Sequence, residues 1–238
     1  MLTAGGPVCN AMGGDGERLR LASPRGGRYK PRVGLVYRGG GRCRFETRPR
    51  GAPMDFAARF DEGLGYDDFL GTYGTEEQRA RWKSVHDRVA LTDGQQRLLR
   101  SFVREIKVLV VAGTWCGDCV NQCPIFDHVE RTAGCVKFRY FDRDAHGDLA
   151  QELAICGAPR VPSLLYLSED GFPCGRGGDR TLSTYRWLAE TQLGPACPTG
   201  LAQPPELLAR VTEDWLAEFE RVHLMLRLSG RLRKLHGD

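Results

Sequence analysis

The sequence lacks any long apolar run, and this absence limits what the chain can be. Its longest wholly apolar stretch, VLVVA at residues 108–112, is far shorter than the roughly 20 residues that cross a bilayer. A signal peptide has a basic start followed by an apolar segment, and the N-terminus lacks this pattern. We therefore expect a soluble, unexported protein that is located in the cytoplasm and has no membrane partner.

The chain also lacks the paired cysteine motifs that hold a structural metal. Of its nine cysteines, only Cys116 and Cys119 form a CxxC pair. Structural zinc sites take four converging ligands, usually from two separated pairs, and the five histidines show no metal-ligand pairing. A Gly-rich phosphate loop and a Ser/His/Asp set are missing as well. We therefore expect no metal and no bound cofactor, and most cysteines should be reduced thiols.

Positive charge is confined to one end of the chain. Residues 1–53 carry a net charge of +8, which leaves −4 for residues 54–238 out of a total of +4. The first segment is rich in glycine and has no hydrophobic periodicity, so it cannot bury enough apolar area to offset its ordering entropy. We predict a disordered Gly/Arg-rich tail, which could be an artefact of start-site choice because Met54 opens the first amphipathic pattern. An RNA-binding tail is the alternative, but we expect no nucleic-acid partner.

Residues 54–104 have helical periodicity and are predicted to form an N-terminal helical extension. Thr75 and Thr92 stand where helix N-caps are expected. After Thr92, apolar residues at helical spacing predict one helix that continues to Ile106. They are Leu98, Leu99, Phe102, Val103 and Ile106.

Residues 105–195 are predicted to form a domain of strand–helix–strand–helix order, followed by two strands and a helix. Short apolar or alternating runs predict the strands, and 3.6-residue periodicity predicts the helices. The expected strands are residues 107–112, 136–144, 161–168 and 172–178, and the expected helices are residues 119–133, 147–155 and 181–192. Thr181 or Asp179 would cap the last helix.

Residues 196–238 are predicted to contain a Pro/Gly connector and a C-terminal helix. Apolar residues from Leu207 to Leu226 recur at helical spacing. A structural helix that docks on the domain is the favoured interpretation, and a partner-binding helix is the alternative. The basic end, residues 231–238, is expected to fray.

The most specific motif is the segment GTWCGDCVNQCP, which follows a buried strand. Its CxxC pair begins a helix, Trp115 precedes the pair, and Pro124 lies five residues after Cys119. The pair Val161–Pro162 stands just ahead of the third strand. This combination resembles the thioredoxin superfamily, most closely the bacterial thioredoxin-like proteins with a WCGDC motif. The resemblance implies an α/β thioredoxin-like fold, a central mixed sheet flanked by helices, here with extra N- and C-terminal helices.

The position of Cys116 and Cys119 favours thiol-disulfide exchange. At a helix N-terminus Cys116 meets unpaired backbone N–H groups, which should lower its pKa and make it the nucleophile. Cys119, one turn further along, is placed to attack the mixed disulfide that Cys116 forms with a substrate. We predict an oxidoreductase that reduces protein or small-molecule disulfides and takes its electrons from a small thiol or a reductase.

Five neighbours of the pair are expected to bind the substrate or to tune the thiols. Trp115 would offer a contact surface, and a cis-Pro162 would hold the backbone around Val161 extended to receive a substrate strand. Asp118 stands where thioredoxins usually have proline, next to Gly117 of the motif. Its negative charge would oppose thiolate formation at the reactive sulfur.

Two positions leave alternatives open. The buried acid that the family carries six residues before the first cysteine is Val110 here, which slightly favours a redox-inactive binding module. Cys123 lies one turn past Cys119, so it could capture an oxidised Cys119 or take part in a metal or persulfide carrier. We expect Cys123 to be a small buried apolar side chain instead.

Overall fold

The computed structural model describes residues 54–193 and 206–238. The predictions for the tail and for most of the connector lie outside these residues, and the predicted boundaries after residues 104 and 195 stay predictions. Residues 54–238 form one compact unit. Its helices are α1 (Phe56–Asp61), α2 (Tyr66–Tyr73), α3 (Glu76–His86), α4 (Asp93–Arg100), α5 (Gly117–Ala133), α6 (Gly147–Glu152), α7 (Leu182–Leu188), the π-helical turn η1 (Ala189–Leu193), α8 (Leu207–Leu228) and α9 (Gly230–His236). Its strands are β1 (Ile106–Ala112), β2 (Val136–Asp142), β3 (Ser163–Ser168) and β4 (Pro173–Gly178).

The four strands form one mixed sheet in the order β2-β1-β3-β4. β1 runs parallel to β2 and antiparallel to β3, and β4 pairs antiparallel with β3. The continuous apolar run of β1 is explained by its place, since an inner strand covered on both faces needs apolar side chains on both. The predicted α/β fold with a central mixed sheet flanked by helices is confirmed.

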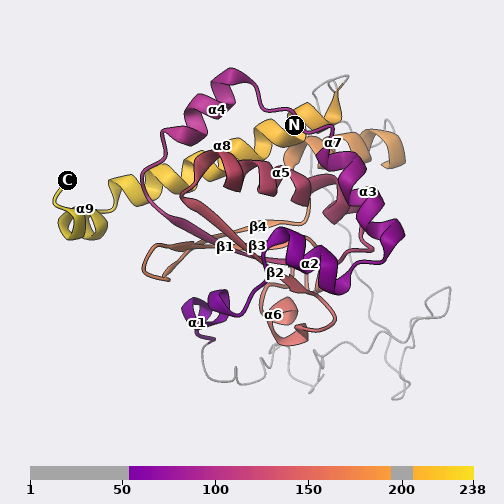
Figure 1. The fold of residues 1–238 in the computed structure, drawn as a ribbon, viewed down its shortest axis with the longest axis horizontal. Helices are drawn as coiled ribbons and strands as arrows, with labels where there is room; N and C mark the ends of the chain where they lie inside the picture. The colour runs from indigo at the N-terminus through magenta and orange to yellow at the C-terminus, as the bar shows by residue number, and fades with distance from the viewer. Residues whose placement is uncertain (1–53, 194–205) are drawn as a thin grey trace, which may run out of the picture. The chain divides into compact units, whose positions relative to one another are not determined.

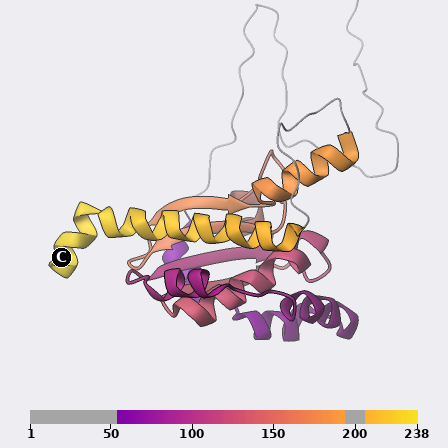
Figure 2. The ribbon, with the colours of Figure 1, turned by 90° about the horizontal axis from the view of Figure 1, so that it is seen from above.

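Helices cover both faces of the sheet. α5 and α8 lie on one side, where they contact each other, and α8 runs along the sheet in both views (Figures 1 and 2). α1 and α6 lie on the opposite side (Figure 1). The CxxC motif therefore sits at one end of a helix that is enclosed between the sheet and other helices.

The long C-terminal helix α8 docks through aromatic side chains. Trp215 meets Phe126 of α5 edge-on, with ring centroids 4.8 Å apart. Phe219 packs edge-on against Phe138 of β2 at 5.5 Å. Such pairs add about 0.5–1.5 kcal/mol each to the stabilisation from buried area. The apolar stripe of α8 thus packs inside the domain, as the favoured interpretation predicted.

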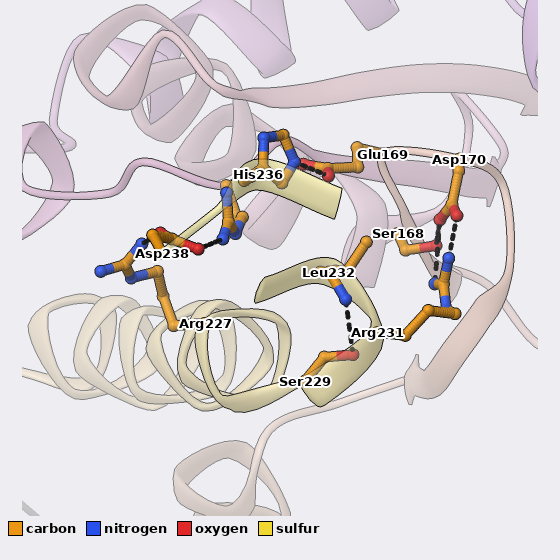
Figure 3. A network of polar contacts seen from close by, with 10 residues as sticks. Ser168, Glu169, Asp170, Arg227, Ser229, Arg231, Leu232, His236 and Asp238 are labelled. Carbon is orange, nitrogen blue, oxygen red and sulfur yellow. Dashed lines mark hydrogen bonds and ion pairs between the residues drawn. The ribbon is translucent and has the colours of Figure 1, made fainter. Parts of the chain in front are cut away.

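The prediction that residues 231–238 fray is wrong, because they belong largely to α9. The hydroxyl of Ser229 accepts from the backbone N–H of Leu232 and caps the helix. Arg231 donates to Asp170 in the turn between β3 and β4 (Figure 3). This hydrogen bond lowers the pKa of the Asp170 carboxyl to about 2. Charged pairs between distant segments, which periodicity does not reveal, hold the chain end in place.

The predicted helix after Thr92 is shorter than expected. Thr75 and Thr92 both cap their helices with complete capping boxes, as predicted. α4 ends at Arg100, however, and Val103 is 61% exposed. Ile106 already belongs to β1, so the extension of the helix to this residue is wrong.

Candidate functional site

The CxxC pair lies where the chain passes from the end of β1 into α5. Cys116 is the N-cap residue of α5, with extended backbone angles, and its N–H donates to the carbonyl of Gly113 at 3.0 Å. Pro124 lies inside α5. The local order of buried strand, tight turn and helix therefore presents the first sulfur at the edge of the domain and directs the second one inward.

Three sulfurs follow one another from the surface into the core. Cys116 is half-buried, whereas Cys119 and Cys123 are both 0% exposed. The thiol of Cys119 is in hydrogen-bond contact with both of the others. Of these three sulfurs, only that of Cys116 can meet a substrate without a change in the fold.

The segment before β3 faces the first sulfur. The Val161–Pro162 peptide bond is cis, and the thiol of Cys116 donates to the carbonyl of Val161 at 3.5 Å. The structure therefore brings together three of the predicted site residues, although they are separated by 45 positions in the sequence.

The prediction of a lowered pKa for Cys116 is wrong for the dithiol form. The hydrogen bond with the Cys119 thiol raises the pKa of Cys116, and burial and the charge of Cys119 raise it further. The backbone N–H groups of Cys119 and Asp118 act in the predicted direction, but they do not compensate. Burial also raises the pKa of Cys119. Val110, which is fully buried, stands where the family carries its buried acid and offers no carboxylate to Cys119.

Asp118 forms an ion pair that sequence analysis missed. Its Oδ1 accepts a hydrogen bond from Nε of Arg180 at 3.1 Å, and its Oδ2 lies 2.8 Å from Nη2 in an ion pair. A hydrogen bond between two charged groups is roughly twice as strong as one between neutral groups. The charge that was expected to oppose the thiolate is therefore balanced by a cation at the start of α7.

A buried amide connects this region to α8. The side-chain N–H groups of Gln122 donate to the backbone carbonyls of Asp118 at 3.2 Å and Asp179 at 2.8 Å. Its oxygen accepts from the indole N–H of Trp215 at 3.0 Å. Gln122 thus fixes the segment that carries Arg180 against the first turns of α5, and no local sequence signal marks it.

Trp115 forms one wall of the site and is 42% exposed. A Cβ on Gly113 would lie 2.7 Å from the Trp115 ring, so only glycine allows the ring to pack there. The guanidinium of Arg143 lies 4.3 Å from the centroid of the Trp115 ring, within the range of a cation–π interaction. At Gly117, by contrast, an added Cβ would meet no atom within 4 Å.

These residues surround an open cleft of about 440 Å³ at the Cys116 sulfur. It is lined by Trp115, Cys116, Asp118, Arg143, Pro159, Arg160, Val161, Asp179 and Arg180. Arg160 donates to the buried carboxylate of Asp179 at 3.1 Å. Four of the seven predicted site residues line the cleft: Trp115, Cys116, Asp118 and Val161. Cys119 lies behind them and contacts the Cys116 thiol. Gly117 and Pro162 are neighbours of lining residues in the chain.

Two further properties concern only the part of the chain that the structure describes. Within residues 54–193 and 206–238, no group of three or more His, Cys, Asp or Glu side chains is arranged to hold a metal ion. None of the described helices has the length and apolar character needed to cross a membrane.

Comparisons with known proteins agree with this architecture. A protein of unknown function from Pseudomonas aeruginosa is 22% identical, with 71% of this chain and 99% of that chain covered, at a TM-score of 0.56. An HIV epitope scaffold is 20% identical over 70% of this chain and 99% of that one, at a TM-score of 0.53. These likenesses show the fold alone, and no curated protein matches the chain. The family model described as thioredoxin matches residues 63–185, just over half of the sequence, and the chain therefore belongs to the thioredoxin family.

Proposed function

We propose that the protein is a dithiol–disulfide oxidoreductase that acts through Cys116 and Cys119. The observation that carries this proposal is the arrangement of the two thiols. A half-exposed sulfur stands in an open cleft, in hydrogen-bond contact with a fully buried second sulfur. A purely structural cysteine pair would have no need of access to the solvent.

The reaction proceeds in two exchanges. The Cys116 thiolate attacks one sulfur of a substrate disulfide, so that a Cys116–substrate bond forms and the first substrate thiolate leaves. The Cys119 thiolate then attacks the Cys116 sulfur and expels the second substrate thiolate. The substrate gains two electrons, and the protein is left with a Cys116–Cys119 disulfide. A small thiol or a reductase returns the two electrons.

The contacts of the cleft suggest how the substrate is held. The extended backbone at Val161 and Pro162 would lie beside the substrate, and Trp115 would cover the reacting sulfurs.

Reduction of disulfides suits a reducing compartment such as the cytoplasm. Val110 contributes no acid, so the thiols and the solvent exchange the protons of the reaction.

Trapping of the mixed disulfide tests this proposal. Cys119→Ser should accumulate a covalent Cys116–substrate adduct with a protein disulfide such as insulin, and Cys116→Ser should form none. Cys174→Ser, at a half-buried cysteine on β4, is the matched control and should reduce the same substrate within about twofold of the wild-type rate. If Cys116→Ser keeps the activity, another thiol is the nucleophile and the proposed roles are wrong. If the wild type shows no activity, the fold serves as a binding module and the proposal is wrong.

A further inference from the structure

We propose that the cleft selects small disulfides that carry carboxylate groups close to the S–S bond. This inference rests on the proposed function and names the substrate class of the same site. Three arginines, Arg143, Arg160 and Arg180, line the cleft together with only two carboxylates. The lining thus carries one more positive than negative charge, because Asp144, the partner of Arg143, lies outside it. Residues 54–238 as a whole, by contrast, carry a net charge of −4.

Arg143 and Arg160 remain available to a ligand although each has an acidic partner. Arg143 pairs with the exposed carboxylate of Asp144 at 2.9 Å and keeps 31% of its side chain exposed. The guanidinium of Arg160 donates a hydrogen bond from Nη1 to Asp179. Within the described residues its Nε and Nη2 make no hydrogen bond, so they can bind an anion. Guanidinium groups of this kind suit the planar geometry of a carboxylate.

The position of Arg143 is the most informative. Its guanidinium lies over Trp115, the residue directly before the nucleophile. A carboxylate a few bonds from the scissile disulfide could therefore reach Arg143 while one substrate sulfur faces Cys116. The volume of about 440 Å³ falls in the range of small-molecule pockets, roughly 300–1,000 Å³, so a small disulfide fits the cleft.

A carboxylate-bearing disulfide undergoes the same two exchanges as any other disulfide substrate. Cys116 attacks one sulfur and releases a carboxylate-bearing thiolate, and Cys119 releases the second one. Positive charge in the cleft steers the anionic disulfide to the nucleophile and stabilises the anionic leaving group. The reduced protein supplies both electrons, so a single turnover requires no further reductant.

Three small disulfides of different charge test the inference in single turnover. Dithiodipropionate is a dianion at neutral pH, 2-hydroxyethyl disulfide is neutral and cystamine is a dication. Each rate is divided by the rate of the same disulfide with dithiothreitol, which removes differences in intrinsic reactivity. The wild type should favour the dianion over the neutral compound by fivefold or more, and about 0.5 M salt should weaken this preference because exposed charges are screened.

Substitutions of charged residues show whether Arg143 causes the preference for the dianionic disulfide. Arg143→Gln should reduce the relative rate with the dianion about fivefold and leave the neutral disulfide within twofold. Asp144→Asn frees Arg143 from its partner and should increase the rate with the dianion. Arg176→Gln, which makes the same change of charge on β4 at an arginine paired with Glu152, is the matched control and should change neither rate.

The outcomes separate this inference from the proposed function. The inference is overturned, and the oxidoreductase stands, if the rates with the three disulfides relative to dithiothreitol are equal. It is also overturned if Arg143→Gln and Arg176→Gln change the rate with the dianion equally. If the wild type reduces none of the three faster than Cys116→Ser does but still reduces insulin, the inference fails and the oxidoreductase stands. If it reduces insulin no faster than Cys116→Ser either, the proposed function itself fails.

Discussion

The indole N–H of Trp82 donates to the backbone carbonyl of Thr114 at 2.9 Å, and both residues are buried. This hydrogen bond joins α3 to the loop that carries Trp115 and Cys116. The hydroxyl of Thr114 also donates to the carbonyl of Tyr73, at the end of α2. The N-terminal helices therefore do more than cover the sheet, because they fix the backbone next to the reactive thiol.

Replacement of the donor should weaken this anchor. Trp82→Phe keeps an aromatic ring but leaves the Thr114 carbonyl buried without its partner, which costs about 1–3 kcal/mol in the free energy of unfolding. Urea unfolding measures the change. Trp187→Phe, at a tryptophan that is 43% exposed, should change the stability by less than about 0.5 kcal/mol. Equal effects of the two variants would contradict a specific role for the hydrogen bond.

Much of the fold follows from local patterns in the sequence. The strand β1 is a continuous apolar run, and Thr75 and Thr92 are N-caps that a short window of sequence reveals. The CxxC motif and the proline at position 162 are local signals as well. Each of these features depends on residues that are near one another in the chain, which is why they could be predicted.

The rest depends on contacts between distant positions. Asp118 and Arg180 are 62 positions apart, and Gln122 and Trp215 are 93 apart. No periodicity or motif specifies such pairs. The pKa of Cys116 was predicted from the helix terminus alone, but the burial of the sulfur and its contact with the Cys119 thiol depend on the folded chain. The direction of the shift could not be obtained from the motif.

Charge substitutions at the ion pair should shift the pKa of Cys116 in opposite directions. Asp118→Asn leaves the Arg180 cation without its partner, which favours the Cys116 thiolate and lowers the pKa. Arg180→Gln leaves the carboxylate alone, which disfavours the thiolate and raises the pKa. Two exposed charges interact by about 1 kcal/mol at 4 Å, so the rate of Cys116 alkylation at pH 7 should rise up to about fivefold in the first variant and fall up to about fivefold in the second. A change of the rate in the same direction in both variants would contradict the account.

The raised pKa of Cys116 predicts a steep pH dependence of its alkylation. Because the thiolate is the reactive species, a thiol whose pKa lies above its ordinary value of 9.0 is mostly protonated at neutral pH. The rate of labelling by iodoacetamide should then rise about tenfold per pH unit between pH 6 and 8. Mass spectrometry of the labelled peptide reports Cys116 alone. A plateau below pH 7 would show that the pKa is lowered instead.

The two glycines around the nucleophile should respond differently to alanine. Gly113→Ala places a methyl group against the Trp115 ring and should displace it, which we expect to slow disulfide reduction several-fold. Gly117→Ala fills open space at the start of α5 and should leave the rate within about twofold, with stability unchanged or raised by up to about 1 kcal/mol. Steady-state reduction and thermal unfolding of both variants check this. A greater loss of activity in Gly117→Ala would contradict the packing described.

A redox titration with identification of the paired cysteines tests the central claim most directly. The purified protein is equilibrated across a series of glutathione ratios, quenched with acid, alkylated and mapped by mass spectrometry. The account predicts one two-electron transition in which Cys116 and Cys119 form the disulfide while Cys123 stays a free thiol. A transition that pairs Cys119 with Cys123, or no transition across the series, would contradict it.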